Sequence, residues 1–197
     1  MKKTFTHIIT ACLILGSLCG CSVSKTENAN TTENITEQSG NSTAINPWVD
    51  LNEDAAMKVL TKSFKAPDGA GDVSWQTYQS DTPSETEVKY IQLSFTMNGT
   101  EFHARGYEGL LNWNDISGMY YNWTSTEDGK STIWGKNDIA YQKSSYVGDD
   151  NDPNDSDAML LEWYDADSLT MYSLSATGND LNGVDLVAIA EMMNGEK

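Results

Sequence analysis

The chain has 197 residues, with 29 acidic and 12 basic side chains and a net charge of −17. So acidic a protein repels phosphate groups, which argues against a nucleic-acid partner. All three cysteines lie within the first 21 residues, so the remainder has no thiol for a disulfide, a thiolate zinc site or a cysteine nucleophile.

The N-terminus has the features of a bacterial lipoprotein signal peptide. Lys2 and Lys3 precede an apolar stretch at 5–18 that is too short to span a bilayer, and Leu18-Cys19-Gly20-Cys21 looks like a lipobox. We expect residues 1–20 to be removed and Cys21 to carry diacylglycerol with palmitate-type chains. Two acyl chains anchor a protein stably, so the predicted location is the extracytoplasmic face of the cell membrane.

Two further regions follow the predicted signal peptide. Residues 21–44 are rich in Ser, Thr, Asn, Glu and Gln and bury too little apolar surface to offset chain entropy, so we expect the lipidated cysteine to be followed by a disordered tether. Aromatic and aliphatic residues recur from residue 45, and 45–197 has the length of one domain. This domain carries the whole net charge, which favours solubility near a negative envelope.

The first expected element of the domain is a helix. Asp50 and Glu53 have the spacing of a capping box, and Pro67 with Gly69 would end the element. Apolar residues follow at helical spacing: Leu51, Ala55, Val59 or Leu60, and Phe64.

Three hairpins are expected next, after a strand at 73–79. Asn98-Gly99 predicts a two-residue turn that pairs Phe95 with Phe102 on a buried face and leaves His103 and Arg105 on a solvated face. A second turn is predicted at Asp128-Gly129. A third turn, at 165–168, would join strands 159–164 and 169–174.

The last expected element is a helix at 181–193, with an apolar stripe of Val184, Val187, Ala188 and Met192. The order of a helix, antiparallel strands and a helix predicts an α+β fold. In it a curved antiparallel sheet built from hairpins has both the N-terminal and the C-terminal helix packed on one face.

Three stretches carry a resemblance to a known family: Asn46-Pro47-Trp48, residues 115–120, and Trp163-Tyr164 followed by residues 171–175. Together they resemble an uncharacterised domain of lipid-anchored extracytoplasmic proteins of Gram-positive bacteria. The last stretch is also similar to the C-terminal domain of some membrane-tethered anti-sigma-like proteins. The resemblance implies location and domain limits, and it assigns no catalytic residue.

His103 and Arg105 are the most conspicuous single side chains of the predicted domain. His103 is its one histidine, and a Ser-His-Asp triad would need it together with a serine such as Ser94. No nucleophile motif is present, and an open sheet face provides no oxyanion hole, so we interpret His103 as a surface histidine. Arg105 is the chain's one arginine, for which a local salt bridge to an acid such as Glu101 and the binding of a carboxylate ligand both stay open.

Two groups of residues are candidate binding sites. Calcium prefers six to eight oxygen ligands, which the acidic segment 149–157 could supply through Asp150, Asp152, Asp155 and Asp157; the alternative is a polar loop. Aromatic side chains could stack on a ligand, with Tyr121, Trp123 and Trp134 as candidates; the alternative is a packed core.

The absence of a catalytic motif favours a non-enzymatic binding or interaction module that needs no cofactor, with an envelope protein or a glycan as partner. The alternative is a hydrolase of the cell envelope or of extracellular glycans, which would act through a pair of carboxyl groups that sequence spacing does not identify.

Overall fold

The computed structural model describes residues 46–79, 88–135, 138–149, 151–152 and 154–195. The chain divides into two units after Thr43, and all described residues belong to the second unit. The predicted signal peptide, the lipidated Cys21, the tether and Asp150 lie outside the described residues.

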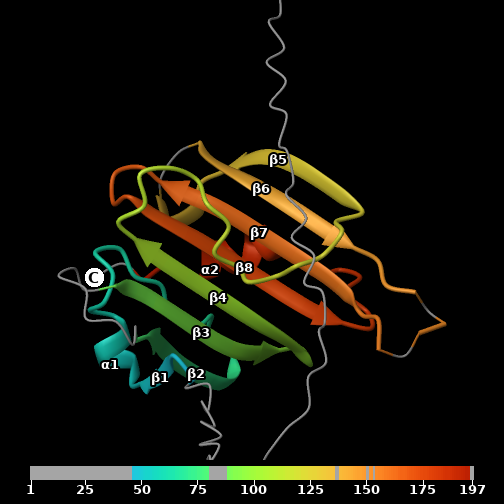
Figure 1. Cartoon of the computed structure of the whole chain (residues 1–197), viewed down its shortest axis with the longest axis horizontal. Helices are drawn as coiled ribbons and strands as arrows, with labels where there is room; N and C mark the ends of the chain where they lie inside the picture. The colour runs from blue at the N-terminus through green and yellow to red at the C-terminus, as the bar shows by residue number, and fades with distance from the viewer. Residues whose placement is uncertain (1–45, 80–87, 136–137, 150, 153, 196–197) are drawn as a thin grey trace, which may run out of the picture. The chain divides into compact units, whose positions relative to one another are not determined.

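Eight antiparallel strands form one sheet in the order β1-β2-β3-β4-β8-β7-β6-β5 (Figure 1). Each strand pairs with its neighbour in sequence, except that β4 lies beside β8 at the centre. The strands are β1 (Trp48–Leu51), β2 (Gly71–Tyr78), β3 (Lys89–Met97), β4 (Thr100–Glu108), β5 (Ser125–Ser131), β6 (Ile139–Tyr146), β7 (Asp157–Asp165) and β8 (Thr170–Gly178).

One face of the sheet carries the hydrophobic core. Two short helices, α1 (Glu53–Ala56) and α2 (Leu186–Met192), and the 3₁₀ turn η1 (Ile133–Gly135) pack there together with the segment 57–66. Alternation of side chains along the strands turns Leu93, Phe95 and Trp163 into this core. We call the opposite side of the sheet the outer face.

The predicted α+β fold is wrong, because the domain is essentially an antiparallel sheet with two short helices. The N-terminal helix expected from Asp50 is not formed. Asp50 lies in β1, Asn52 caps the four-residue α1, and the chain beyond it is irregular. Leu60 and Phe64 are nevertheless buried, because Gly106 of β4 leaves room for them: a Cβ at Gly106 would lie 2.5 Å from Leu60 Cδ1.

The C-terminal helix is shorter than expected, and a different stripe is buried. It begins at Leu186, because the carboxylate of Asp185 accepts hydrogen bonds from the backbone N–H groups of Val187 and Ala188. The predicted stripe is half right: Val184 and Val187 are partly buried against the core, but Ala188 is exposed and Met192 is 48 % exposed. The side chains that enter the core are Leu186, Ile189, Ala190 and Met193.

The hairpin at Asn98-Gly99 is confirmed with its register. Phe95 pairs with Phe102, and their rings stack at a centroid distance of 5.2 Å. Asn98 and Gly99 both have positive φ, as a type I′ turn requires. The tight turn thus fixed the buried face as the sequence predicts.

The hairpin predicted at Asp128-Gly129 is wrong, because both residues lie inside β5. Gly129 serves close packing, since a Cβ there would overlap the ring of Tyr141 on β6. The chain reverses instead between Ser131 and Ile139. Glu127 lies opposite Lys143 of β6 and forms an ion pair with it.

The third predicted hairpin exists as β7 and β8. Its turn lies one residue later than expected, and Leu169 adopts a positive φ within it. Tyr164 therefore pairs with Met171. A two-residue change of partner keeps every side chain on its expected face, because strand side chains alternate with a period of two.

Candidate functional site

The outer face carries a row of polar side chains that crosses all eight strands. Each member is the direct partner of the next: Asp50, Gln76, Gln92, Arg105, Ser173, Glu162, Gln142 and Asp128. We call it the outer polar row. At one end Gln76 Nε2 donates to Asp50 Oδ1 over 3.0 Å, and at the other Gln142 Nε2 donates to Asp128 Oδ1 over 3.2 Å.

Residues 109–124, which we call the crossing connection, run over this row (Figure 1). The topology demands such a path, because β4 and β5 are consecutive in the chain but four strand spacings apart in the sheet, or about 19 Å. Tyr164 of β7 holds the beginning of the connection, where its hydroxyl donates to the Leu110 carbonyl over 2.7 Å.

Arg105 anchors the middle of the crossing connection. Its Nη1 donates to the carbonyls of Ser117 (2.5 Å) and Ile116 (3.2 Å), while its Nε donates to Gln92 over 2.7 Å. Tyr90 donates to the same Ile116 carbonyl over 2.7 Å. Ile116 and Ser117 are buried as a result.

Glu162 and Asp115 form a second link between sheet and connection. Glu162 is only 5 % exposed, and its Oε1 has no hydrogen-bond partner. Burial, the charge of Asp115 and a hydrogen bond with that residue together raise the pKa of Glu162 to about 7. Asp115 Oδ1 also accepts from the backbone N–H and hydroxyl of Ser117, over 2.8 and 2.7 Å. The two carboxyl groups can share one proton.

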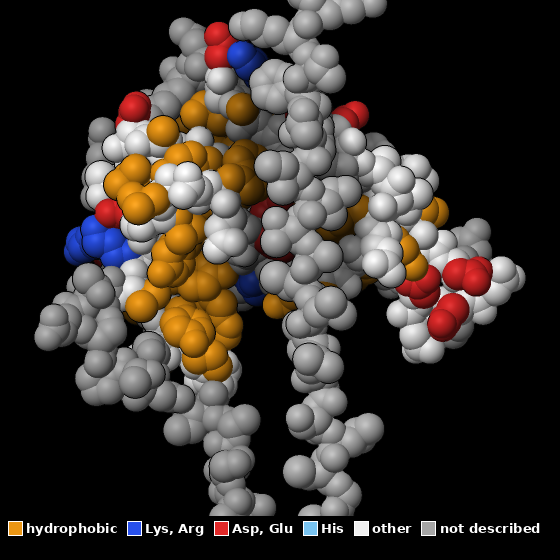
Figure 2. Space-filling view, turned by 45° about the horizontal axis from the view of Figure 1, so that its top comes forward, with side chains coloured by type: hydrophobic (Ala, Val, Ile, Leu, Met, Phe, Trp, Pro, Cys, Tyr) orange, Lys and Arg blue, Asp and Glu red, His pale blue; other side chains and the backbone are white. Residues whose placement is uncertain are grey.

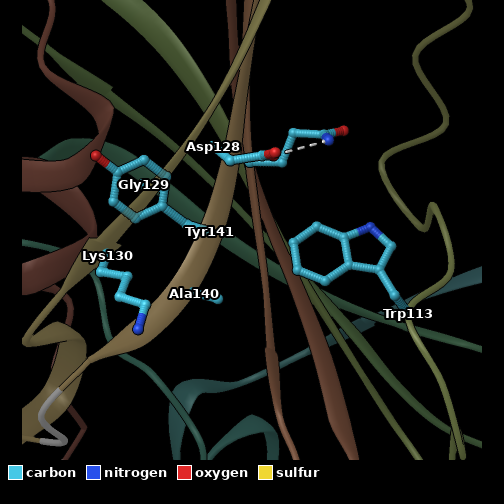
Figure 3. Close-up of a pocket in the computed structure, with 7 residues that line it drawn as sticks. Trp113, Asp128, Gly129, Lys130, Ala140 and Tyr141 are labelled. Carbon is cyan, nitrogen blue, oxygen red and sulfur yellow. Dashed lines mark hydrogen bonds between the residues drawn. The ribbon is translucent and has the colours of Figure 1, made fainter. Parts of the chain in front are cut away.

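A pocket of about 560 Å³ lies between the crossing connection and β5–β6. Trp113 supplies one side, and the other side consists of Asp128, Gly129, Lys130, Ala140, Tyr141 and Gln142. Figure 3 shows the Trp113 indole across the hollow from the strand that carries Ala140, with the Gln142–Asp128 hydrogen bond beside it. The pocket thus combines an aromatic ring that is 41 % exposed with carboxylate, amide and ammonium groups.

Four aromatic rings gather on the outer face near its other edge, where Figure 2 shows apolar side chains over β1–β4. Their ring centroids lie 5.1–6.2 Å apart: Trp48 contacts Tyr78 and Tyr90, and Tyr90 also contacts Tyr78 and Tyr107. The guanidinium of Arg105 lies 5.4 Å from the Trp48 ring centre. All four rings are half-buried, and this packing braces β1 against the sheet.

His103 does meet the serine considered for a triad. Ser94 Oγ and His103 Nδ1 are hydrogen-bonded at 2.8 Å, and Glu101 lies 3.6 Å from His103 Nε2. Burial lowers the pKa of His103, against the opposing effect of Glu101. Ser94 lies in mid-strand with neighbours on both sides, so sheet pairing uses the backbone N–H groups that an oxyanion hole would need.

The structure separates the three aromatic residues predicted to stack on a ligand. Tyr121 and Trp123 contact each other at 5.4 Å, and Tyr121 also packs on Tyr146 of β6. Trp134 is 4 % exposed in the core, where its indole N–H donates to the Ala190 carbonyl. A ligand therefore cannot stack on all three rings together.

The acidic segment is folded onto its own polar groups. Asp149 and Asp152 accept hydrogen bonds from the backbone of residues two positions later, and Asp155 accepts from the Tyr146 hydroxyl over 2.8 Å. Asp157 accepts from the Gly148 N–H over 3.0 Å. Within the described part of the chain, no three His, Cys, Asp or Glu side chains are grouped so as to hold a metal ion.

Sequence reasoning missed Glu162, Asp115 and Trp113. Glu162 had a usable signal, since it lies between Leu161 and Trp163 as the one charged residue of the stretch 158–164. Asp115 belongs to the stretch 115–120 that carries the resemblance, and the structure makes this stretch the anchor of the connection. Trp113 had no signal, because its position depends on the path of the connection.

Neither helix of the described part of the chain is long and apolar enough to cross a membrane. We compared the chain with protein-family models, with curated proteins and with solved structures, and none of them matches it. Evidence for function therefore comes from the outer face itself.

Proposed function

We propose that the protein is a lipid-anchored extracytoplasmic binding module, and that its ligand is a neutral glycan held in the pocket beside Trp113. The anchor rests on the lipobox ending in Cys21, and the uncharacterised family of lipid-anchored proteins that the chain resembles has the same location. The observation that carries the binding function is the Trp113 pocket of about 560 Å³.

The chemistry of the pocket suits a sugar ring. A pyranose has an apolar C–H face and a rim of hydroxyl groups, so it needs a flat apolar surface with hydrogen-bonding groups around it. The exposed Trp113 indole supplies that surface. Asp128, Gln142 and Lys130 supply acceptors and donors for the hydroxyls.

The negative net charge of the protein favours some classes of ligand over others. A net charge of −17 disfavours phosphate-rich or carboxylate-rich polymers, so a neutral sugar fits this pocket better than an anionic one.

The carboxyl groups on this face favour binding over glycan hydrolysis. Glycosidases place two carboxyl groups about 5–9.5 Å apart on either side of the scissile bond. Glu162 and Asp115 are instead in hydrogen-bonding contact, and Glu162 lies beneath the connection. The pair therefore suits a role in holding the crossing connection.

The test is calorimetric titration of the domain with a panel of neutral oligosaccharides of glucose, galactose and N-acetylglucosamine. Trp113→Ala should weaken the binding that is found by about tenfold or more, which corresponds to ~1.4 kcal/mol. Tyr120→Ala is the matched control, because Tyr120 is on the same connection and 95 % exposed but does not line the pocket. Absence of binding across the panel, or equal losses in both variants, would overturn the proposal.

A further inference from the structure

Glu162 and Asp115 link the outer face of the sheet to the crossing connection above it. Glu162 is the buried acid of the outer polar row, and one of its carboxyl oxygens has no partner. An ionised carboxylate in such a place lacks the hydrogen bonds that normally offset its desolvation. A protonated one satisfies the site, because its O–H can donate to Asp115 on the connection.

The charged and titratable groups around Glu162 do not neutralise the negative charge that its carboxylate carries when ionised. Asp115 faces it from the connection, and Asp128 lies in the same row on β5. Arg105 is two strands away, about 10 Å, and its guanidinium is engaged by carbonyls of the connection. Outside this row stand His103 and Glu101 of β4, Lys130 of β5, and Tyr164 on β7 itself.

We propose that Glu162 and Asp115 form a proton-held catch that fixes the crossing connection to the sheet and thereby positions Trp113 for its ligand. With one proton on the pair, the carboxyl of Glu162 donates to the carboxylate of Asp115. Without it, two carboxylates face each other over a buried floor, and the connection loosens. Ligand binding at the pocket is then tighter in acid than in alkaline solution, an inference that rests on the proposed function.

The pKa of Glu162 lies in a range where an ordinary change of pH can open or close such a catch. Burial, with added effects of Asp115, raises the pKa of Glu162 to about 7, so the proton leaves between mildly acidic and mildly alkaline conditions.

The first experiment needs no ligand. Hydrogen exchange of the backbone amides of 109–124 is measured in the domain at pH 5.5 and pH 8.5, and protection is corrected for the intrinsic rate at each pH. In the wild type, protection should fall by up to about tenfold for each pH unit between the ordinary pKa of Glu162, 4.5, and its raised pKa of about 7, and should level off above that pH. Glu162→Gln and Asp115→Asn, which each remove one carboxyl group and keep a neutral hydrogen-bonding side chain, should retain protection at pH 8.5.

Two control variants test whether the pH response comes from Glu162 and Asp115 rather than from another titratable group. His103→Gln removes the histidine of the outer face, and Glu53→Gln removes an exposed acid of α1 on the other side of the sheet. Both should respond to pH as the wild type does. A wild type with equal protection at both pH values, or a Glu162→Gln variant that loses protection as the wild type does, would overturn the catch.

The second experiment separates the catch from the glycan assignment. The affinity for the tightest oligosaccharide of the panel is measured at both pH values, and it should fall several-fold at pH 8.5 in the wild type but not in Glu162→Gln. If exchange behaves as expected and no oligosaccharide binds, the catch stands and the glycan assignment fails. If an oligosaccharide binds with equal affinity at both pH values, the control of ligand binding by the catch fails.

Discussion

At the scale of single residues, the outer face depends on side chains that hold backbone rather than on ion pairs. Arg105 was open to a local salt bridge with Glu101, but it donates to Gln92 and to two carbonyls of the crossing connection. Gly118 follows these carbonyls with φ +68°, where a Cβ would overlap the Arg105 guanidinium. The position therefore needs glycine for its backbone angle and for the space beside Arg105.

Gly118→Ala should destabilise the domain more than a glycine replacement that costs backbone strain alone. A left-handed backbone costs a non-glycine residue about 1–2 kcal/mol, and displacement of Arg105 adds to that. Gly183→Ala is the matched control, because Gly183 has φ +81° and nothing within 4 Å of a Cβ. Urea unfolding compares the two variants, and equal losses would show that Arg105 does not constrain the position.

The raised pKa of Glu162 predicts how the stability of the domain depends on pH. Its pKa rises from the ordinary 4.5 to about 7 on folding, so the folded state binds the proton more tightly. The resulting stability is present below pH 4.5 and is lost as the pH rises through about 7. Glu162→Gln should therefore gain free energy of unfolding relative to the wild type between pH 5 and pH 8. A difference that stays constant across this range, measured by urea denaturation, would contradict the account.

At the scale of elements, the sequence predicted what local patterns determine. Asn98-Gly99 fixed a register of nine pairs, because both turn residues adopt positive φ between alternating strands. Asp128-Gly129 has the same appearance but is extended, since the ring of Tyr141 occupies the space that a glycine leaves. The capping pattern at Asp50 failed because pairing of Asp50 with Gln76 places it in a strand. Long-range partners decide such cases, and neither spacing nor propensity contains them.

The candidate site was less predictable than the fold for the same reason. Trp113 and Asp128 come from two segments that meet only because β5 lies at the far edge of the sheet from β1. The isolated acid at Glu162 was visible in the sequence, but its partner Asp115 depends on the crossing path.

The confirmed hairpin gives a direct test of the two faces. Phe95→Ala or Phe102→Ala should each cost about 3–5 kcal/mol of stability, since both rings are buried and stacked. His103→Thr on the outer face should cost much less, because its side chain is 39 % exposed. Chemical denaturation compares the three variants, and comparable costs on both faces would mean that the outer face is also tightly packed.

At the scale of the whole molecule, the sheet presents two different surfaces. The core face is closed by α1, α2 and the segment 57–66, whereas the outer face is covered in its middle by one connection and keeps a pocket beside Trp113. Figure 2 also shows acidic side chains gathered at one end of the domain. A domain with one closed face and one accessible polar face suits a tethered binding module.

Anchoring is the prediction that concerns the chain as a whole. Cys21→Ser should remove the lipid attachment site, so the protein should leave the membrane fraction or persist as an uncleaved precursor. Metabolic labelling with palmitate, followed by fractionation, compares the variant with the wild type. A wild-type protein that incorporates no label would rule out the predicted lipid anchor.

The most direct test of the binding function is to follow the Trp113 indole N–H resonance by NMR as the tightest neutral oligosaccharide is titrated into the domain. The account predicts that this resonance and the backbone amides of Asp128 and Gln142 shift together and saturate at one ligand concentration. Shifts confined to Tyr121, Trp123 and Tyr146, with Trp113 unmoved, would contradict it and place the ligand at another aromatic cluster.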